Sequence, residues 1–247
     1  MILQIAGGCG SWLLLQWVGA DKVLCEGTLM GFLCPVASSV AVVSCMLGAN
    51  RQTVTTYAII GNLMVALVAP LTFTLIGEHG EIGFIHSVWM IARKLGSTLA
   101  LPFVIAVFLQ WLWPKGNAWI AQYRGIAFYL WALALLCTLG QTIHYIHENG
   151  TGQWSLIGWM AVLSLTVCIV QFAVGRHLGR RYGDVISGGQ LLGQKNSAMG
   201  IWMTNTFLSP LASVFIACYS IYQNLFNSWQ IWQHERKEKS ETRSPHD

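Results

Sequence analysis

The stretch VISGGQLLGQKNSAMGIWMTNTF (Val185–Phe207) decides the fold, because it is apolar enough for a membrane helix but cannot form an unbroken one. Three glycines, Gly188, Gly189 and Gly193, come just before a polar segment, Gln194–Ser197, that contains a lysine. A helix interrupted at membrane depth exposes backbone N–H and C=O groups, and it is tolerated only where protein buries it or where it lines a cavity. The stretch therefore predicts a broken span at a transport or binding site.

The composition extends this interpretation to the whole chain. Hydrophobic residues make up 54% of the 247 residues and charged residues only 10%, whereas soluble domains have about 25% charged residues. We therefore expect an all-α polytopic membrane protein with about eight spans, since a span needs about 20 apolar residues. The expected spans are 2–20, 23–48, 52–77, 87–112, 124–145, 154–175, 186–205 and 207–232.

The second span is also expected to be broken. Pro35 removes a backbone donor and disfavours a helical Cys34, and Ser38 and Ser39 follow at once. Spans 1–3 and spans 6–8 therefore share the order plain, broken, plain, and they enter the membrane from opposite sides. This predicts inverted repeats, with two matched breaks at the site.

Mid-span amides follow each break, Asn62 in the third span and Asn224 in the eighth. They either line the site or join helices, with even chances.

The basic residues in the connectors between spans predict the orientation of the chain in the membrane. Lysine and arginine concentrate on the side of the C-terminus, with ten such residues against three on the other side. By the positive-inside rule, both termini of a multi-pass protein of the plasma or inner membrane are expected in the cytoplasm. Residues 234–247, which mix both signs of charge, are expected to form a disordered cytoplasmic tail.

Three segments resemble the bile acid:sodium symporter family: CPVASSVAVVSCMLGANRQ (Cys34–Gln52), IGNLMVALVAPLTF (Ile60–Phe73) and GQKNSAMGIWMTNTFLSPLASVFIACYSIYQNLFNSW (Gly193–Trp229). The resemblance implies a ten-helix fold in which two broken helices cross. It implies that residues 1–77 form the first half of a core domain, 78–150 form panel helices and 151–233 form the second half of the core. It also implies transport of organic anions, such as bile acids and other carboxylates or sulfates, usually driven by sodium. The chain starts at what would be the third helix of that family, so we expect the first two helices to be missing and Met1 to be a truncated or internal start.

The resemblance also implies site residues. Gln4 falls on a sodium-site glutamine, and Asn196 and Ser197 match the polar pair after the second break. Aligned on Gly193, the sodium-binding glutamate of the family falls on Leu191 and its glutamine on Lys195. Gln190 lies one residue from the acidic position, Gln194 lies in the same motif, and Cys34, Pro35, Ser38 and Ser39 belong to the first crossover.

The lysine makes sodium coupling doubtful. Sodium takes oxygen ligands, and an ammonium about 4 Å away would repel it. With no acid expected within the spans, the partners available to Lys195 are backbone carbonyls, amides such as Gln4 or Asn224, water or a substrate anion. In one hypothesis the ammonium takes the structural place of sodium and tethers the crossover, with protons as an alternative coupling ion. In the other hypothesis it binds the substrate carboxylate, and a lysine that snorkels to the surface is a third interpretation.

The expected function is therefore secondary transport of organic anions by alternating access. The alternative is a non-transporting, degenerate member or fragment that acts as a helix-packing partner. No motif for an enzyme is present, the seven cysteines have no metal-binding spacing, and we expect no cofactor. The expected partners are the lipid bilayer, a small organic anion, and a second copy or another chain that supplies the missing helices, with no nucleic acid.

Overall fold

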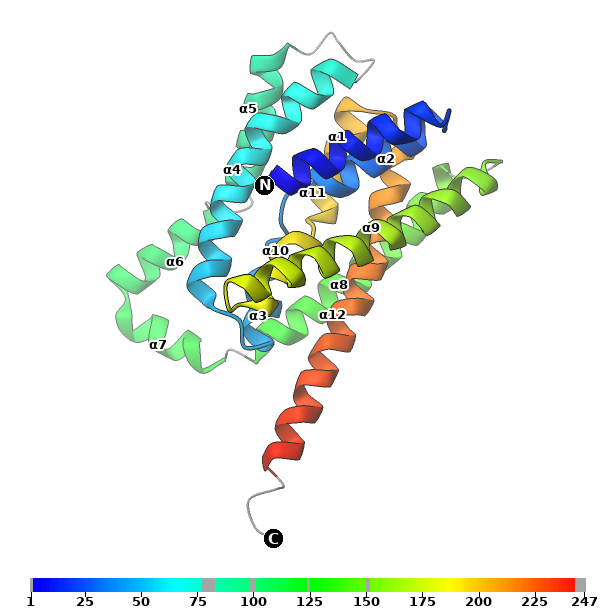
Figure 1. Cartoon of the computed structure of the whole chain (residues 1–247). Coiled ribbons are helices and arrows are strands. Elements are labelled where there is room, and N and C mark those ends of the chain that lie inside the picture. Colours follow the sequence, from blue (N-terminus) through cyan, green and yellow to red (C-terminus); the bar gives the residue numbers. More distant parts are fainter. Residues whose placement is uncertain (1, 77–82, 98–100, 124, 150–151, 243–247) are drawn as a thin grey trace.

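The chain is all-helical wherever its structure is described. A computed structural model describes residues 2–76, 83–97, 101–123, 125–149 and 152–242, and in these the only bridge between extended segments is an isolated pair of residues (Figure 1). The helices are α1 (Ile2–Trp17), α2 (Lys22–Leu33), α3 (Val40–Met46), α4 (Arg51–Ile76), α5 (Phe84–Leu95), α6 (Leu101–Leu112), α7 (Pro114–Gln122), α8 (Ile126–Asn149), α9 (Trp154–Arg181), α10 (Val185–Gly193), α11 (Ser197–Phe207), the short 3-10 helix η2 (Pro210–Ala212) and α12 (Ser213–Thr242).

Two of the described helices, α4 and α9, are long and apolar enough to cross a membrane. They contain 26 and 28 residues, and each has a window with a mean hydropathy of 2.1. Large apolar side chains on their outer faces are more than half exposed, including Leu63, Leu67 and Ile169. Contact of such large apolar side chains with lipid is favourable, whereas their contact with water is unfavourable. The count of eight spans stays a prediction, because only these two of the described helices pass this test.

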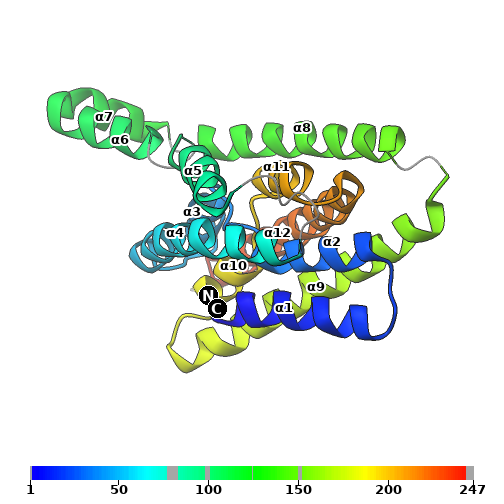
Figure 2. The same cartoon turned by 90° about the horizontal axis from the view of Figure 1, so that it is seen from above.

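One apolar core holds the middle of the chain together. Its buried side chains come from α2, α4, α5, α9, α11 and α12. Helix α1 packs along α2, α8 runs along the outside and contacts α12, and α6 and α7 project away from the rest (Figures 1 and 2). The half-helices α3 and α10 lie outside this core and pack in two smaller apolar clusters.

Both expected breaks are present. The second expected span divides into α2 and α3, separated by residues 34–39, and the seventh divides into α10 and α11, separated by residues 194–196. Pro35 explains the first break, because a proline cannot donate to the carbonyl four residues before it. At the second break, Gln194 is extended and the side chain of Asn196 caps α11 by accepting a hydrogen bond from Met199 N.

Other boundaries differ from the expectations. The expected span 87–112 is two helices, α5 and α6, and the connector WPKGN begins a helix, α7, whose first residue is Pro114. A proline at this position lacks an N–H that would be unpaired in any case. Helix α12 continues to Thr242, so the tail that we expected to be disordered from residue 234 is helical up to there. The rest of that tail, 243–247, and most of the connector after the third span, 77–82, lie outside the described residues.

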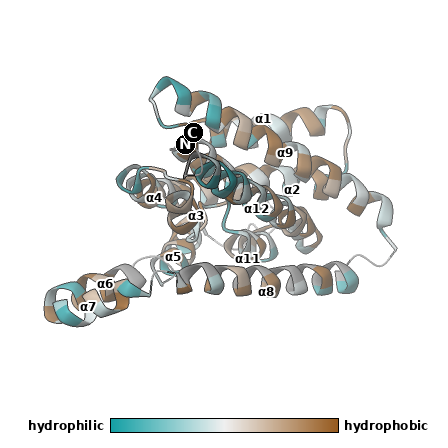
Figure 3. Cartoon of the chain, turned by 90° about the horizontal axis from the view of Figure 1, so that it is seen from below, coloured by the Kyte–Doolittle hydropathy of each residue, from teal (hydrophilic) through white to brown (hydrophobic). Residues whose placement is uncertain are grey.

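Glycines allow α9 and α10 to pack with their backbones in contact. A Cβ atom on Gly175 would lie 2.3 Å from the carbonyl oxygen of Gly188, and a Cβ on Gly188 would lie 2.4 Å from that of Gly175. Side chains of any other type would force the two helices apart. The tight pairing holds α10, and therefore the second break, against the long helix α9. Figure 3 shows that hydrophilic residues gather at the carboxyl ends of α9 and α12.

Candidate functional site: the crossing of two helix breaks

The two breaks cross each other and pair as a minimal antiparallel bridge between Val36 and Lys195. Two backbone hydrogen bonds flank the bridge: Ala37 N donates to Gln194 O at 3.2 Å, and Asn196 N donates to Pro35 O at 2.8 Å. In both, the residue after the bridge donates to the residue before the bridge on the opposite segment. The two breaks are thus bonded in the same way.

An amide side chain clamps the middle residue of each break. Val36 N donates to Asn62 Oδ1 at 2.8 Å, and Asn62 Nδ2 donates to Val36 O at 3.4 Å. In the other break, Lys195 N donates to Gln223 Oε1 at 2.7 Å, and Gln223 Nε2 donates to Lys195 O at 2.9 Å. Asn62 lies on α4 and Gln223 on α12, so each amide satisfies both backbone groups of a buried non-helical residue. Asn62 therefore joins α4 to the first break.

The Lys195 side chain ends on the carboxyl end of a half-helix. The residue is 1% exposed, and its Nζ donates to Phe32 O at 3.0 Å. Phe32 lies in the last turn of α2, where carbonyls lack helical partners, and the N–H four residues later, that of Val36, is bonded to Asn62. A cation there is favoured by the negative end of the helix dipole. Within the described residues, Lys195 Nζ thus has a backbone carbonyl as its partner, which is one of those considered for it.

Two further side chains, Gln171 and Tyr219, donate hydrogen bonds to carbonyls in the last turns of α2 and α10. Gln171 Nε2, from α9, donates to Gly31 O at 3.0 Å and lies 3.2 Å from the Tyr219 hydroxyl. That hydroxyl in turn donates to Gly193 O, the last residue of α10, at 2.6 Å. The last turns of α2 and α10 are therefore linked through α9 and α12.

Leu191, where the resemblance places the acidic ligand, lies in apolar surroundings. It forms a small buried cluster with Val36, Val40 and Val54. None of these four side chains carries an oxygen, so none of them is a ligand for sodium. Leu191 precedes Lys195 by four residues, as Phe32 precedes Val36. Leu191 and Phe32 thus hold equivalent positions in the two breaks. Leu191 lies in an apolar cluster, whereas the carbonyl of Phe32 binds the Lys195 ammonium.

Several predicted residues lie at the crossing. Gln194 Nε2 donates to Ser39 Oγ at 3.2 Å, which joins the two breaks a second time. Cys34 Sγ lies 3.0 Å from Asn196 O, which joins them a third time. Ser197 shares a hydrogen bond of 3.0 Å with the Ser220 hydroxyl of α12.

Other predicted residues lie apart from these contacts. Gln190 Nε2 donates to Asn227 Oδ1 at 3.1 Å, further along α12. Gln4 is 2% exposed, and neither amide atom of its side chain has a partner among the described residues. Ser38 is exposed, and Asn224 Nδ2 reaches only Ser220 Oγ, at 3.5 Å. Asn224 is therefore not the amide that holds the break.

Sequence reasoning missed Gln223, Tyr219 and Gln171 as site residues. A signal was present on α12, because Tyr219, Gln223 and Asn227 follow one another at intervals of four residues. This spacing places them on one face of a helix. All three are buried and contact the second broken span. Gln171 stands alone in an apolar helix and had no such signal.

The expectation that no acid lies within the spans is wrong. Glu26 is in the second turn of α2, 1% exposed. Its carboxylate accepts a hydrogen bond from Ser209 N at 2.9 Å and lies 3.8 Å from Lys22 Nζ. Six residues of helix, about 9 Å, separate Glu26 from Phe32. The buried acid therefore stabilises the start of α2 and does not pair with Lys195.

The crossing of two interrupted helices can be compared with known families. A model of the SBF-like CPA transporter family, a bile acid:sodium symporter-like family, matches residues 2–226. The chain belongs to this family. The match covers every residue of the crossing described above and confirms the resemblance seen in the sequence. None of the curated proteins compared with the chain matches it. This SBF-like protein is therefore a membrane transporter and not an enzyme.

Proposed function

We propose that this SBF-like protein is a secondary transporter of organic anions that works without sodium. The observation that carries the proposal is the contact between the Lys195 ammonium and the Phe32 carbonyl. A tethered cation at the carboxyl end of a half-helix does what a bound metal cation does there, since it neutralises the negative end of the dipole and satisfies an unpaired carbonyl. No ion then has to bind before the crossing is complete.

The surroundings of the lysine support tethering over direct binding of the substrate. The ammonium is buried and bonded to a carbonyl, and Lys195 lines none of four hollows found on the described residues. The apolar cluster at Leu191 supports the loss of sodium, because the place expected to supply an acidic oxygen supplies a leucine. The lysine therefore affects transport by holding the two breaks together and does not bind the substrate itself.

The matched breaks support alternating access by inverted repeats. The helices α1 to α4 and α9 to α12 each contribute a plain helix, a broken helix and an amide clamp. A bridge with the same hydrogen bonds in both directions can serve as the fixed centre while the remaining helices move around it. The crossing would then present its polar backbone to either side of the membrane in turn.

Uptake into proteoliposomes tests the proposal. Purified protein is reconstituted, and accumulation of radiolabelled taurocholate and of a panel of smaller carboxylates and sulfates is followed with an inward gradient of either sodium or potassium. We expect at least one anion to enter at the same rate in both salts. A rate several-fold higher with the sodium gradient would contradict the tethered-cation proposal.

Two variants separate the role of the lysine from general damage. In Lys195→Met the Phe32 carbonyl loses its partner, so uptake should fall at least tenfold. In the double variant Leu191→Glu, Lys195→Gln, the two ligands that the resemblance implies are restored, and uptake should become sodium-dependent. Wild-type uptake by Lys195→Met would show that the lysine is dispensable. Absence of uptake for every anion tested, in folded protein, would favour the non-transporting alternative.

A further inference from the structure

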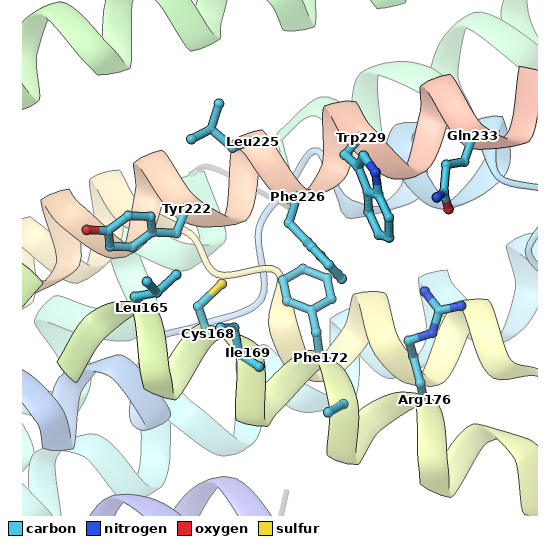
Figure 4. Close-up of a pocket in the computed structure, with 11 residues that line it drawn as sticks. Leu165, Cys168, Ile169, Phe172, Arg176, Tyr222, Leu225, Phe226, Trp229 and Gln233 are labelled. Atoms are coloured by element: carbon cyan, nitrogen blue, oxygen red, sulfur yellow. The ribbon is translucent and has the colours of Figure 1, made fainter. Parts of the chain in front are cut away.

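A long groove runs between α9 and α12, and Phe172 in its wall packs against Gly193 at the end of α10. Its volume is about 650 Å³, which lies within the range of about 300–1,000 Å³ typical of ligand pockets. Figure 4 shows that its walls come from these two helices alone, with apolar side chains along most of its length. Neither the transport proposal nor the expected site residues involve this groove.

Aromatic rings form the middle of the groove. The rings of Phe172 and Phe226 have centroids 4.5 Å apart, and those of Phe226 and Trp229 are 5.5 Å apart. Trp229 and Leu225 are 47% and 64% exposed, so the groove is open along one side. An elongated apolar chain could enter it sideways, as a chain within the membrane would.

One end of the groove is cationic. Arg176 and Gln233 lie there, facing each other from α9 and α12 (Figure 4). Arg176 Nη1 donates to Gln230 Oε1 at 3.3 Å, and no carboxylate among the described residues forms a salt bridge with this guanidinium. A guanidinium has five N–H donors, so an amide partner leaves donors for an anion.

A second hollow continues from the same arginine. It has a volume of about 560 Å³ and shares Ala173 and Arg176 with the groove, and it adds His177 and Arg180. The apolar groove therefore leads past Arg176 into a basic hollow at the end of α9. This shape and charge match a molecule with an apolar chain and an anionic head.

We propose that the groove and the basic hollow together bind an anionic phospholipid of the surrounding bilayer. The acyl chain lies along the aromatic wall formed by Phe172, Phe226 and Trp229. The phosphate binds Arg176 and Arg180, at the depth where basic residues between helices meet lipid head groups. The lipid then fills the space between α9 and α12 and fixes the spacing of the helices that carry Gln171 and Gln223.

Native mass spectrometry of the purified full chain tests this. Phosphatidylglycerol or phosphatidylcholine with identical acyl chains is titrated in, and the bound lipids are counted. We expect phosphatidylglycerol to bind about tenfold more tightly than phosphatidylcholine. Removal of one basic contact in Arg176→Gln should weaken phosphatidylglycerol about fivefold and phosphatidylcholine less, because the choline of phosphatidylcholine already offsets the charge of its phosphate. Ala173→Phe, which fills the exposed junction of the two hollows, should weaken both lipids.

Arg236→Gln is the matched control, because Arg236 lies on α12 over the ring of Trp232 and outside both hollows. It removes the same charge and should leave binding of both lipids unchanged. Equal affinity for the two lipids would overturn the proposal, as would equal losses in Arg176→Gln and Arg236→Gln. Displacement of phosphatidylglycerol by millimolar inorganic phosphate would show a site for free anions and would also overturn it.

Discussion

At the scale of single residues, the buried charge of Lys195 is the main difference between the two breaks. A charged side chain at the centre of a bilayer costs about 2.5–3.5 kcal/mol or more, so it needs a partner. Lys195 has one in the Phe32 carbonyl, while the equivalent residue of the other break, Val36, packs beside Leu191. The backbone around the two residues is bonded alike, so the difference lies in the side chains alone.

The amide clamps give a prediction at this scale. Gln223→Leu leaves the N–H and C=O of Lys195 without partners, and each buried unpaired group costs about 1–3 kcal/mol. The melting temperature of the purified protein should therefore fall clearly, and Asn62→Leu should have an effect of the same kind. Asn224→Leu is the neighbouring control, because that amide makes only one long hydrogen bond. Equal destabilisation by Gln223→Leu and Asn224→Leu would argue against the clamp.

At the scale of helices, the pairing of α9 with α10 positions the second break. Gly175 and Gly188 bring the two backbones into contact, and Gly193 packs directly on the ring of Phe172. The first break is held differently, because Gly27 and Gly31 of α2 accommodate the side chain of Phe215 from α12. Small residues thus set the distance between helices on both sides of the crossing.

Alanine substitutions in α9 test this arrangement. In Gly175→Ala the added Cβ would lie 2.3 Å from a backbone oxygen, which cannot move aside, so we expect a loss of about 1–3 kcal/mol and a lower melting temperature. In Gly158→Ala the same atom meets nothing within 4 Å. This control should be neutral or slightly stabilising, since alanine favours a helix over glycine. Similar melting temperatures for the two variants would show that the contact is not tight.

At the scale of the whole molecule, topology is a prediction that the fold leaves to experiment. We expect the end of α12 on the cytoplasmic side and the start of α9 on the opposite side, because basic residues gather at the carboxyl ends of both helices. Single cysteines at two exposed positions test this, Gln153→Cys before α9 and Ser240→Cys in the last turns of α12. A membrane-impermeant maleimide added to intact cells should increase labelling over the parent chain only in Gln153→Cys. The opposite pattern would invert the topology.

The sequence predicted the breaks well because their causes are local. Pro35 removes a backbone donor and Asn196 is a residue type that favours the start of a helix, and both breaks lie where they were expected. The choice of Gln223 over Asn224 could not be predicted in the same way, because the two amides are adjacent and only the packing of α12 decides which one faces the break. Glu26, in contrast, could have been found from the sequence, because it lies within the expected span 23–48, and only its contacts with Lys22 and Ser209 N required the folded chain.

The positive charge of Lys195 belongs to the protein itself and cannot dissociate, which has a consequence for the direction in which an anion would be transported. A dissociable ion is released with its cargo, whereas a side chain returns with the empty carrier, so each cycle would move only the charge of the substrate. The membrane potential, negative inside, would then drive an anion outward, by about 2.3 kcal/mol per charge at 100 mV. This corresponds to a ratio of about fifty between the two sides at equilibrium. Replacing an ion with a lysine would thus convert an accumulating carrier into one that favours efflux.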